Sequence, residues 1–384
     1  MRLFQWTACA ALLAAAPLSG QWFGEGGNAD SVTVAAVGDI IAHDGQLQAA
    51  RDETRGVYDF GPVFRYVQDL LSNSDITVGN LETTLPGRRD RYSGYPSFGA
   101  PDALAAALRG AGFDLLNTAN NHSPDKGRDA MIRTLDVLDS LGLRHVGTYR
   151  DSSDYARNSV QFVECRGIRL AFVAYTYGTN GRIPDGCVVS VLDSATIASD
   201  MRFAAAADPD FILAILHYGA EYRTEPDTSQ IQWTDYLFNE GADVVLGGHP
   251  HVLQRWEKTR RTDRRGRTAD RLAVYSLGNF ISNQRTPNRD GGMIFSFTLK
   301  RRWLESGACE RSVENIGAVP VWVFDRWSPA LEGAAAGATW TNRFVILPIP
   351  HYLENYRPFD LPDASLKRMR GFLKDFRERI QPDP

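Results

Sequence analysis

The stretch that decides the fold reads VVLGGHPH and spans residues 244–251. Its aliphatic start is typical of a buried strand, and the two glycines that follow let the backbone approach a ligand without a side-chain clash. His249 and His251 lie two residues apart, and alternate residues of an extended segment project the same way. The pattern predicts a strand whose loop presents two imidazoles to one site. The competing interpretation is a pair of histidines that cap a helix or bond to backbone carbonyls.

Five further apolar runs end abruptly in a short cluster of Gly, Asn, Asp, Glu or His. The clusters are Gly38-Asp39, Gly79-Asn80-Leu81-Glu82, Asn120-Asn121-His122, His217-Tyr218-Gly219 and Gly278-Asn279. In open α/β sheets, the loops beyond the carboxyl ends of the strands converge on a crevice that collects ligands. The six loops are therefore predicted to form one site.

Short apolar runs alternate with segments of helical periodicity, which is typical of an α/β fold. Strands are expected at residues 32–37, 76–78, 114–117, 169–174, 211–216, 244–246 and 272–276. Helices are expected at residues 62–71, 101–111, 129–141, 231–240 and 365–380. The last helix is amphipathic, and packing against the main sheet is its expected role.

The composition is that of an ordinary globular protein. Its 384 residues are 43% hydrophobic and 23% charged, enough for one large domain or two smaller ones. The formal net charge of -4 gives no reason to expect a nucleic-acid partner, because such proteins usually carry a basic excess.

The first twenty residues are typical of an export signal. A basic residue at position 2 precedes a largely apolar run, residues 3–18, and small residues follow. This run is short for a membrane span of about 20 residues, which favours a cleaved signal peptide over a retained N-terminal membrane anchor. The chain is therefore expected in the periplasm or at the cell surface. A disulfide between Cys165 and Cys187 stays open, because spacing alone does not fix the required geometry.

Five of the seven histidines lie in or just after the strand-end loops. They are His43, His122, His217, His249 and His251. Imidazoles combined with carboxylate and amide oxygens suit divalent Zn, Fe or Mn. The lack of clustered cysteines in the sequence argues against a structural Cys-rich zinc site.

The ordered series of motifs resembles the CapA, or poly-γ-glutamate synthesis, family of the calcineurin-like metallophosphoesterase superfamily. The matching motifs are Gly38-Asp39, Gly79-Asn80-Leu81-Glu82, Asn120-Asn121-His122, His217, Gly247-Gly248-His249-Pro250-His251 and Tyr275-Ser276-Leu277-Gly278-Asn279-Phe280. The resemblance covers about residues 32–297. It implies a four-layer α/β/β/α sandwich over residues 32–300, with residues 301–384 as a C-terminal extension packed on the same domain.

The resemblance also implies roles for individual residues. The implied metal ligands are Asp39, Asn121, His217, His249 and His251. His122 falls on the position of the catalytic imidazole, which would protonate a leaving oxygen or stabilise charge on the transferred group. The residues that orient the ligands or contact substrate are expected among Asn80, Asn120, Asp125, Glu221 and Asn279, with Asp243 as a further carboxylate near the motifs. For the three carboxylates, a helix cap or a surface position is the competing interpretation.

Two positions depart from the superfamily pattern. Ile41 stands where the first motif usually has a histidine, and Asn80 stands where the second motif usually supplies a bridging aspartate. His43 and Glu82 are nearby and are predicted as replacement ligands. The sequence leaves open whether one or two divalent ions bind.

Two further segments have open interpretations. Residues 258–271 are strongly basic and predict either a solvated hairpin or a surface for an anionic polymer or membrane. The loop with Tyr95 and Phe98 is expected either to line the site or only to pack.

The function implied by the resemblance is a metal-dependent cell-envelope protein with a phosphoesterase-type hydrolytic site. It would act in synthesis or export of capsule or poly-γ-glutamate, on an anionic envelope polymer or a phosphoester, with a membrane polymer-synthesis complex as a further expected partner. The alternative is a non-catalytic binding or scaffold subunit with a degenerate metal site, because one fold hosts many chemistries.

Overall fold

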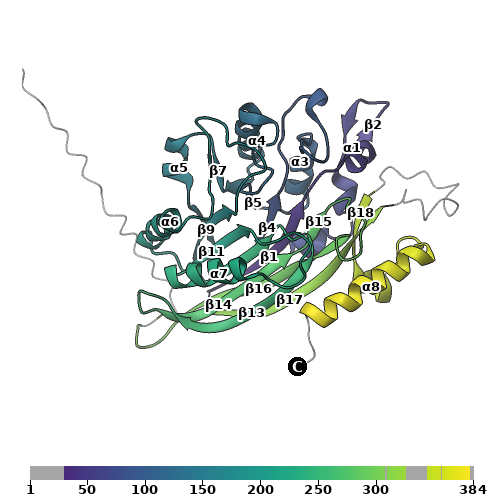
Figure 1. The fold of residues 1–384 in the computed structure, drawn as a ribbon. Helices are drawn as coiled ribbons and strands as arrows, with labels where there is room; N and C mark the ends of the chain where they lie inside the picture. The colour runs from purple at the N-terminus through teal and green to yellow at the C-terminus, as the bar shows by residue number, and fades with distance from the viewer. Residues whose placement is uncertain (1–29, 308, 326–343, 356, 381–384) are drawn as a thin grey trace, which may run out of the picture.

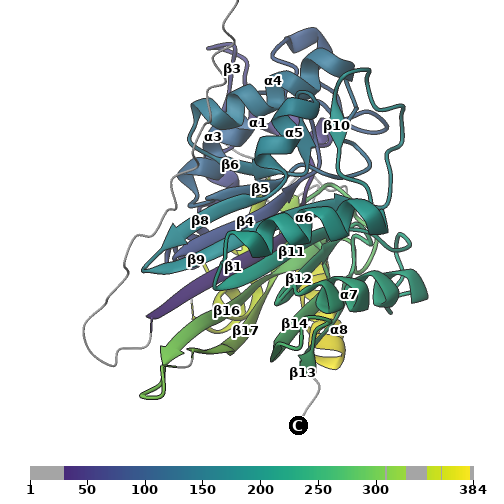
Figure 2. The ribbon, with the colours of Figure 1, turned by 90° about the vertical axis from the view of Figure 1, so that its left-hand side faces the viewer.

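The computed structural model describes residues 30–307, 309–325, 344–355 and 357–380. Two β-sheets pack face to face, and helices cover their outer faces, as Figures 1 and 2 show. The predicted four-layer α/β/β/α sandwich is confirmed. Its layered form follows from strands that are buried on both faces and therefore need a partner on each side.

The first sheet has the strand order β18-β17-β16-β1-β4-β5-β6, with β15 pairing β1. Its strands are β1 (Asp30–Ile40), β4 (Ile76–Leu81), β5 (Leu115–Asn117), β6 (Arg144–Val146), β15 (Asn279–Ile281), β16 (Gly291–Trp303), β17 (Cys309–Asp325) and β18 (Phe344–Pro348). Strands β1, β4, β5 and β6 run parallel. Their carboxyl ends therefore meet at one edge of the sheet.

The second sheet has the order β13-β14-β12-β11-β9-β8. Its strands are β8 (Gln161–Cys165), β9 (Ile168–Thr176), β11 (Phe211–His217), β12 (Val244–Gly248), β13 (Leu253–Thr262) and β14 (Thr268–Leu277). Strands β9, β11, β12 and β14 are parallel, and β13 forms an antiparallel hairpin with β14. Two small pairs join β2 (Arg51–Asp52) to β3 (Val57–Tyr58) and β7 (Thr148–Tyr149) to β10 (Val188–Val189).

Helices are present as predicted near residues 101–111, 129–141, 231–240 and 365–380, whereas the helix at Ser194–Ala206 was not predicted. The helices are α1 (Asp44–Ala50), α2 (Gln68–Ser72), α3 (Ala103–Gly110), α4 (Gly127–Ser140), α5 (Ser152–Asn158), α6 (Ser194–Ala206), α7 (Thr228–Glu240) and α8 (Asp363–Ile380), with the short turns η1 (Gly61–Phe64), η2 (Arg89–Arg91) and η4 (His351–Asn355). Leu104 and Leu138 pack on the outer face of the first sheet, and Met201 and Leu237 on that of the second. The core between the sheets contains Val34 and Leu213.

Two expectations differ from the structure. The single helix predicted at 62–71 is divided into η1 and α2, and residues 65–67 between them form a turn in which the Val67 side chain is buried. The expected boundary at residue 300 falls inside β16, and β17 and β18 extend the first sheet. Helix α8 packs through Met369 and Phe372 into the core between the sheets, beside β17 and β13 in Figure 1.

Three points concern the expected location and cysteine chemistry. The expected signal peptide, residues 1–20, lies outside the described residues. Among the helices that the structure describes, none has the length and apolar character of a membrane span. Cys165, Cys187 and Cys309 are free thiols, so the disulfide that the sequence left open is not formed here.

Candidate metal centre

The strand-end loops of both sheets converge at one edge of the sandwich. Asp39 near the end of β1 lies in register with Asn80 on β4, and His217 at the end of β11 lies in register with Gly248 on β12. Glu82 directly follows β4. The carboxylates thus come from the first sheet and the imidazoles from the second, across the packed core.

The glycines of the deciding stretch allow close backbone approach, as predicted. A Cβ on Gly248 would lie 2.7 Å from Asp39 Oδ1. The backbone N–H of His249 donates to Asp39 Oδ2 at 3.2 Å. The expectation of an extended loop was wrong, because His249 has φ 97° and His251 has φ 58°. Left-handed backbone at a non-glycine residue costs about 1–3 kcal/mol and persists where the surroundings hold it in place.

Two overlapping groups of side chains have the composition of a divalent metal site. Glu82, His249 and His251 form one group and Asp39, Glu82 and His217 form the other, each with its ligand atoms within 4.8 Å of one another. Glu82 belongs to both. Its Oε1 lies 3.5 Å from His217 Nε2 and 4.0 Å from His251 Nε2.

The electrostatics of Glu82 favour a cation beside it. Its side chain is fully buried, and neither carboxylate oxygen has a hydrogen-bond partner among the described residues. Burial, and then the neighbouring charge of Asp39, raise the pKa of Glu82 well above its usual range. Buried polar atoms are normally satisfied by protein, water or an ion. The two unpaired oxygens therefore fit the mixed oxygen and nitrogen donor set of a divalent metal.

Burial also favours the neutral form of two of the imidazoles that face Glu82. Burial lowers the pKa of His217 well below its ordinary value, and it lowers the pKa of His249 to about 4. The His249 Nδ1 atom is buried without a hydrogen-bond partner among the described residues. Because a neutral imidazole is the form that binds metal, these side chains already have the protonation state that a ligand needs.

Asn80 orients its neighbours, and its own oxygen is already engaged. Its Oδ1 accepts hydrogen bonds from Asn117 Nδ2 at 2.9 Å and from Asn120 Nδ2 at 3.2 Å. This fixes the amide, so Nδ2 donates to Asp39 Oδ1 at 2.7 Å and lies 3.0 Å from His217 Nδ1. Asn80 therefore has its oxygen turned away from Asp39 and His217.

Two more amides position the predicted ligands. Asn121 Oδ1 lies 2.8 Å from His217 Nε2. Asn279 Oδ1 lies 3.1 Å from His251 Nδ1, and Asp39 Oδ2 lies 2.9 Å from the same nitrogen. These contacts engage Nδ1 of His251, so its Nε2 is the nitrogen nearer to Glu82. A hydrogen bond to the second ring nitrogen commonly orients a histidine that binds metal.

His122 forms a buried pair with a carboxylate beside these groups. Its Nδ1 lies 2.8 Å from Asp125 Oδ2, and its Nε2 lies 3.4 Å from Asn180 Nδ2. Its backbone N–H donates to Asn120 Oδ1 at 3.1 Å, and its ring packs edge-on against Phe98. Asp125 and Asn120 thus hold both the ring and the backbone of the predicted catalytic histidine.

A cavity of about 770 Å³ opens beside the two groups. Glu82, His122 and His251 line it, together with Tyr95 and Phe98 of the aromatic loop.

Three more predicted residues, His43, Glu221 and Asp243, also lie outside both ligand groups. His43 lines the cavity, and its Nδ1 accepts a hydrogen bond from the Asn283 backbone at 3.2 Å, so its ligand role stays a prediction. Glu221 also lines the cavity. Asp243 is paired with Arg271 at 2.6 Å and lies at the start of β12, at the opposite end of that strand from the site.

Sequence reasoning missed several residues of this site. Tyr177 lies against His249 with ring centroids 4.6 Å apart, and Asn180 donates its backbone N–H to the Asn121 carbonyl at 2.8 Å. Tyr222 and Lys126 line the cavity. The loop that carries Tyr177 and Asn180 follows β9 but begins with neither an acid nor a histidine, so its sequence resembles an ordinary turn. Tyr222 and Lys126 have positive φ angles in the structure, which their residue types do not indicate in the sequence.

Comparison with known proteins supports the interpretation of the motifs. The chain is 26% identical over 280 residues to the capsule biosynthesis protein CapA of Bacillus anthracis, covering 69% of this chain and 63% of that protein. It is 27% identical over 277 residues to the PGA biosynthesis protein CapA of Bacillus subtilis strain 168, covering 71% and 69%. The chain thus spans less than two thirds of the Bacillus anthracis relative.

Among solved structures, the calcineurin-like phosphoesterase YfkN from Bacillus subtilis superimposes with a TM-score of 0.42 at 14% identity, covering 75% of this chain and 91% of that one. The family described as bacterial capsule synthesis protein PGA_cap matches residues 33–284. Since that match spans well over half of the chain, the protein belongs to the PGA_cap family of bacterial capsule synthesis proteins.

Proposed function

We propose that this protein is a metal-dependent hydrolase of phosphoester type that acts in capsule or poly-γ-glutamate biosynthesis or export. The observation that carries the proposal is the Glu82 carboxylate, fully buried between three imidazoles with both oxygens unpaired among the described residues. A carboxylate in this setting is costly unless it is protonated or neighbours a cation. The donor set around it fits Mn, Fe or Zn, as one ion or two.

Asp39, Glu82, His217, His249 and His251 would hold the metal, with Asn121 beside His217. When bound, a divalent ion supplies charge stabilisation for an oxyanion and lowers the pKa of a water. The cavity of about 770 Å³ gives a phosphoester access to Glu82 and His251 of this set. Asn80 and Asn279 keep their neighbours in a fixed orientation, because their amides are themselves hydrogen-bonded.

His122 would act as the general acid. Asp125 engages Nδ1, which leaves Nε2 to deliver a proton to the leaving oxygen. In the overall reaction, a water oxygen bonds to phosphorus while the bond from phosphorus to the leaving oxygen breaks. The leaving oxygen takes the proton from His122, and the proton released by water restores the imidazolium.

One observation favours the second candidate function, a non-catalytic binding or scaffold subunit of a polymer-assembly complex. Asn80 replaces the usual bridging aspartate and donates to Asp39, so it contributes no charge to the centre. Ile41 adds no ligand at the other altered position. The centre therefore holds fewer donors than the usual two-metal site, and Glu82 must compensate for catalysis to be retained.

The proposal includes a location and partners. The apolar segment at residues 3–18 supports export to the periplasm or cell surface. An anionic envelope polymer or a phosphoester is the proposed substrate, and a membrane polymer-synthesis complex is the proposed setting. Hydrolysis of γ-glutamyl amide bonds is the competing chemistry for the same cavity.

Metal content and turnover of the purified protein test the proposal. Phosphomonoesters, phosphodiesters and a γ-glutamyl polymer would be assayed in parallel on the wild type, on His249→Ala and on His351→Ala, an exposed histidine outside the site. Stoichiometric metal and phosphoester turnover that only His249→Ala loses would support the enzyme. A metal-free chain that still restores envelope polymer in a deletion strain would establish the scaffold instead.

A further inference from the structure

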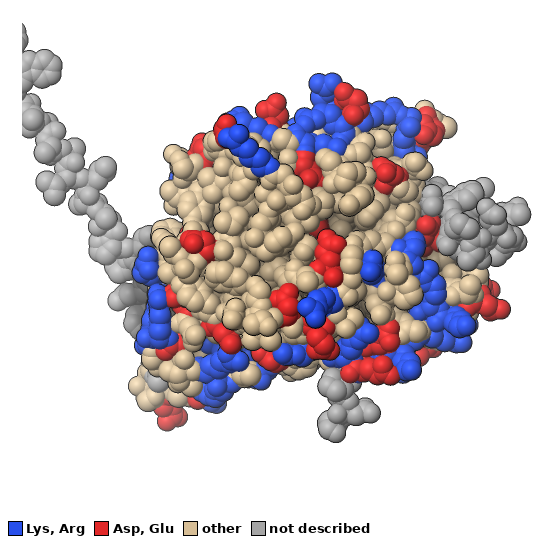
Figure 3. Space-filling view, viewed as in Figure 1, with Lys and Arg blue, Asp and Glu red and all other residues tan. Residues whose placement is uncertain are grey.

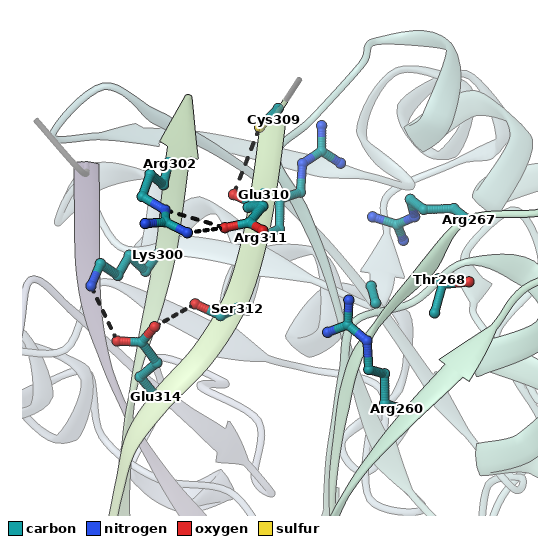
Figure 4. Close-up of a pocket in the computed structure, with 11 residues that line it drawn as sticks. Arg260, Arg267, Thr268, Lys300, Arg302, Cys309, Glu310, Arg311, Ser312 and Glu314 are labelled. Carbon is teal, nitrogen blue, oxygen red and sulfur yellow. Dashed lines mark hydrogen bonds and ion pairs between the residues drawn. The ribbon is translucent and has the colours of Figure 1, made fainter. Parts of the chain in front are cut away.

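A second polar cavity, of about 640 Å³, lies between the free ends of two hairpins (Figure 4). Arg260 and Arg267 line it from the β13–β14 hairpin, and Lys300, Arg302 and Arg311 line it from the β16–β17 hairpin. Blue side chains gather over these hairpin ends at the lower left of Figure 3. The cavity joins the basic stretch noted in the sequence to a second basic segment that is far away along the chain.

The cationic groups face one another across the gap. Figure 4 shows Arg260 and Arg267 on one side and Arg311 on the other. Arg311 has no ion pair among the described residues, although Lys300 and Arg302 pair with Glu314 and Glu310. Like charges held at close range raise the local potential and favour an anion between them.

The carboxylates behind the cavity neutralise its cations only in part. Arg267 and Arg271 share two carboxylates, Asp243 and Asp263. Asp270 alone is shared by two cations, Lys258 and Arg260, at 2.9 Å and 3.1 Å. With Arg311 unpaired among the described residues, the cavity keeps an excess of positive charge.

This cavity is remote from the metal centre. Strand β14 begins at Thr268, which lines the cavity, and ends at Leu277, next to the Gly278-Asn279 cluster of the centre. At about 3.3 Å per residue, the two ends of the strand are roughly 30 Å apart. A ligand confined to the metal centre cannot reach these arginines.

We propose that the cavity between the two hairpins binds a linear polyanion, a chain with carboxylate or phosphate groups. Five cationic side chains around a single gap exceed what one small anion needs, even though two of them pair with Glu310 and Glu314 of the same lining. A chain is favoured over a membrane surface because the cations line a hollow between the hairpins, which a flat bilayer does not enter. The proposal does not depend on catalysis at the metal centre.

Fluorescence anisotropy with a labelled glutamate polymer, in competition with inorganic polyphosphate, tests the proposal. The measurements use the His249→Ala background, so that anion binding at the metal centre does not contribute. The double variant Arg260→Glu/Arg311→Glu is compared with Arg55→Glu, an exposed arginine outside the cavity. We expect on the order of tenfold weaker polymer binding in the double variant, little change in Arg55→Glu, and binding that weakens as salt rises. If the double variant does not fold, Arg311→Gln replaces it, since Arg311 has no ion pair among the described residues to break.

Stronger displacement of the labelled polymer by polyphosphate than by the same polymer without label would assign the site to phosphate chains, and the reverse would assign it to carboxylate chains. Equal affinity in the wild type and the arginine variants would overturn the proposal, as would the absence of polymer binding. Binding to vesicles of anionic lipid with no binding to either soluble polymer would also overturn it, in favour of a membrane surface.

Discussion

Replacing Glu82 with glutamine separates metal binding from folding. The amide has nearly the same shape as the carboxylate but no charge, so it removes the one acid that both ligand groups share. Without metal, the wild-type carboxylate is fully buried with both oxygens unpaired among the described residues. Because an amide is cheaper to bury than a carboxylate, metal-free Glu82→Gln is expected to melt at or above the temperature of the metal-free wild type.

The size of the metal effect follows from linkage. A metal present at a hundredfold excess over its Kd stabilises the folded state by about 2.7 kcal/mol. Across the described residues, an unfolding entropy of about 2.1 cal/mol/K per residue amounts to about 0.7 kcal/mol/K. Metal should therefore raise the melting temperature of the wild type by roughly 4 °C, and that rise should be lost in Glu82→Gln.

Differential scanning calorimetry with and without chelator measures both the melting temperature of the metal-free protein and the rise that metal causes. Glu221→Gln is the matched control, because it changes a carboxylate of the same cavity that lies outside both ligand groups. This control should keep most of the metal-dependent rise. Equal stabilisation of the wild type and Glu82→Gln by metal would refute the reasoning, because Glu82 would then be a buried acid without a ligand role.

Three further outcomes are expected. His122→Ala should lower kcat for a phosphoester about 100-fold to 10,000-fold, as loss of a general acid does, while metal content measured by elemental analysis stays unchanged. Arg271→Met should lower the free energy of unfolding in urea by about 1.5–3 kcal/mol, because it removes the 2.6 Å partner of buried Asp243 while Arg267 still pairs with that carboxylate at 2.9 Å; adding Asp243→Asn should recover part of the loss. Gly248→Ala should reduce metal occupancy, since its Cβ would meet Asp39 Oδ1 at 2.7 Å; full occupancy would show that the loop gives way easily.

The sequence predicted the parallel core of the fold well, because each strand there is a short apolar run that ends in a polar cluster. Residues 211–216 and 244–246 fall within β11 and β12 as observed. The hairpin strands β16 and β17 were missed. Their burial is uneven along their length and several exposed positions carry charge, so neither has the short apolar form of the central strands.

The sequence predicted which residue types meet at the site, but it did not predict the backbone geometry that holds them. Proximity of Asp39 to His249 followed from strand ends meeting at one edge, which topology alone requires. The positive φ angles of His249 and His251 did not follow, because only the packed surroundings stabilise that backbone. The cavity positions of Tyr222 and Lys126 depend equally on tertiary packing, which no local pattern records.

The predicted metal ligands come from two different sheets, and this has a mechanical consequence. Oxygen donors stand on one layer of strands and nitrogen donors on the layer opposite, so an ion bound by both would resist any sliding of one layer over the other. Amide hydrogens in the central strands of both layers should then exchange more slowly in the metal-loaded protein, at positions far from the ion itself.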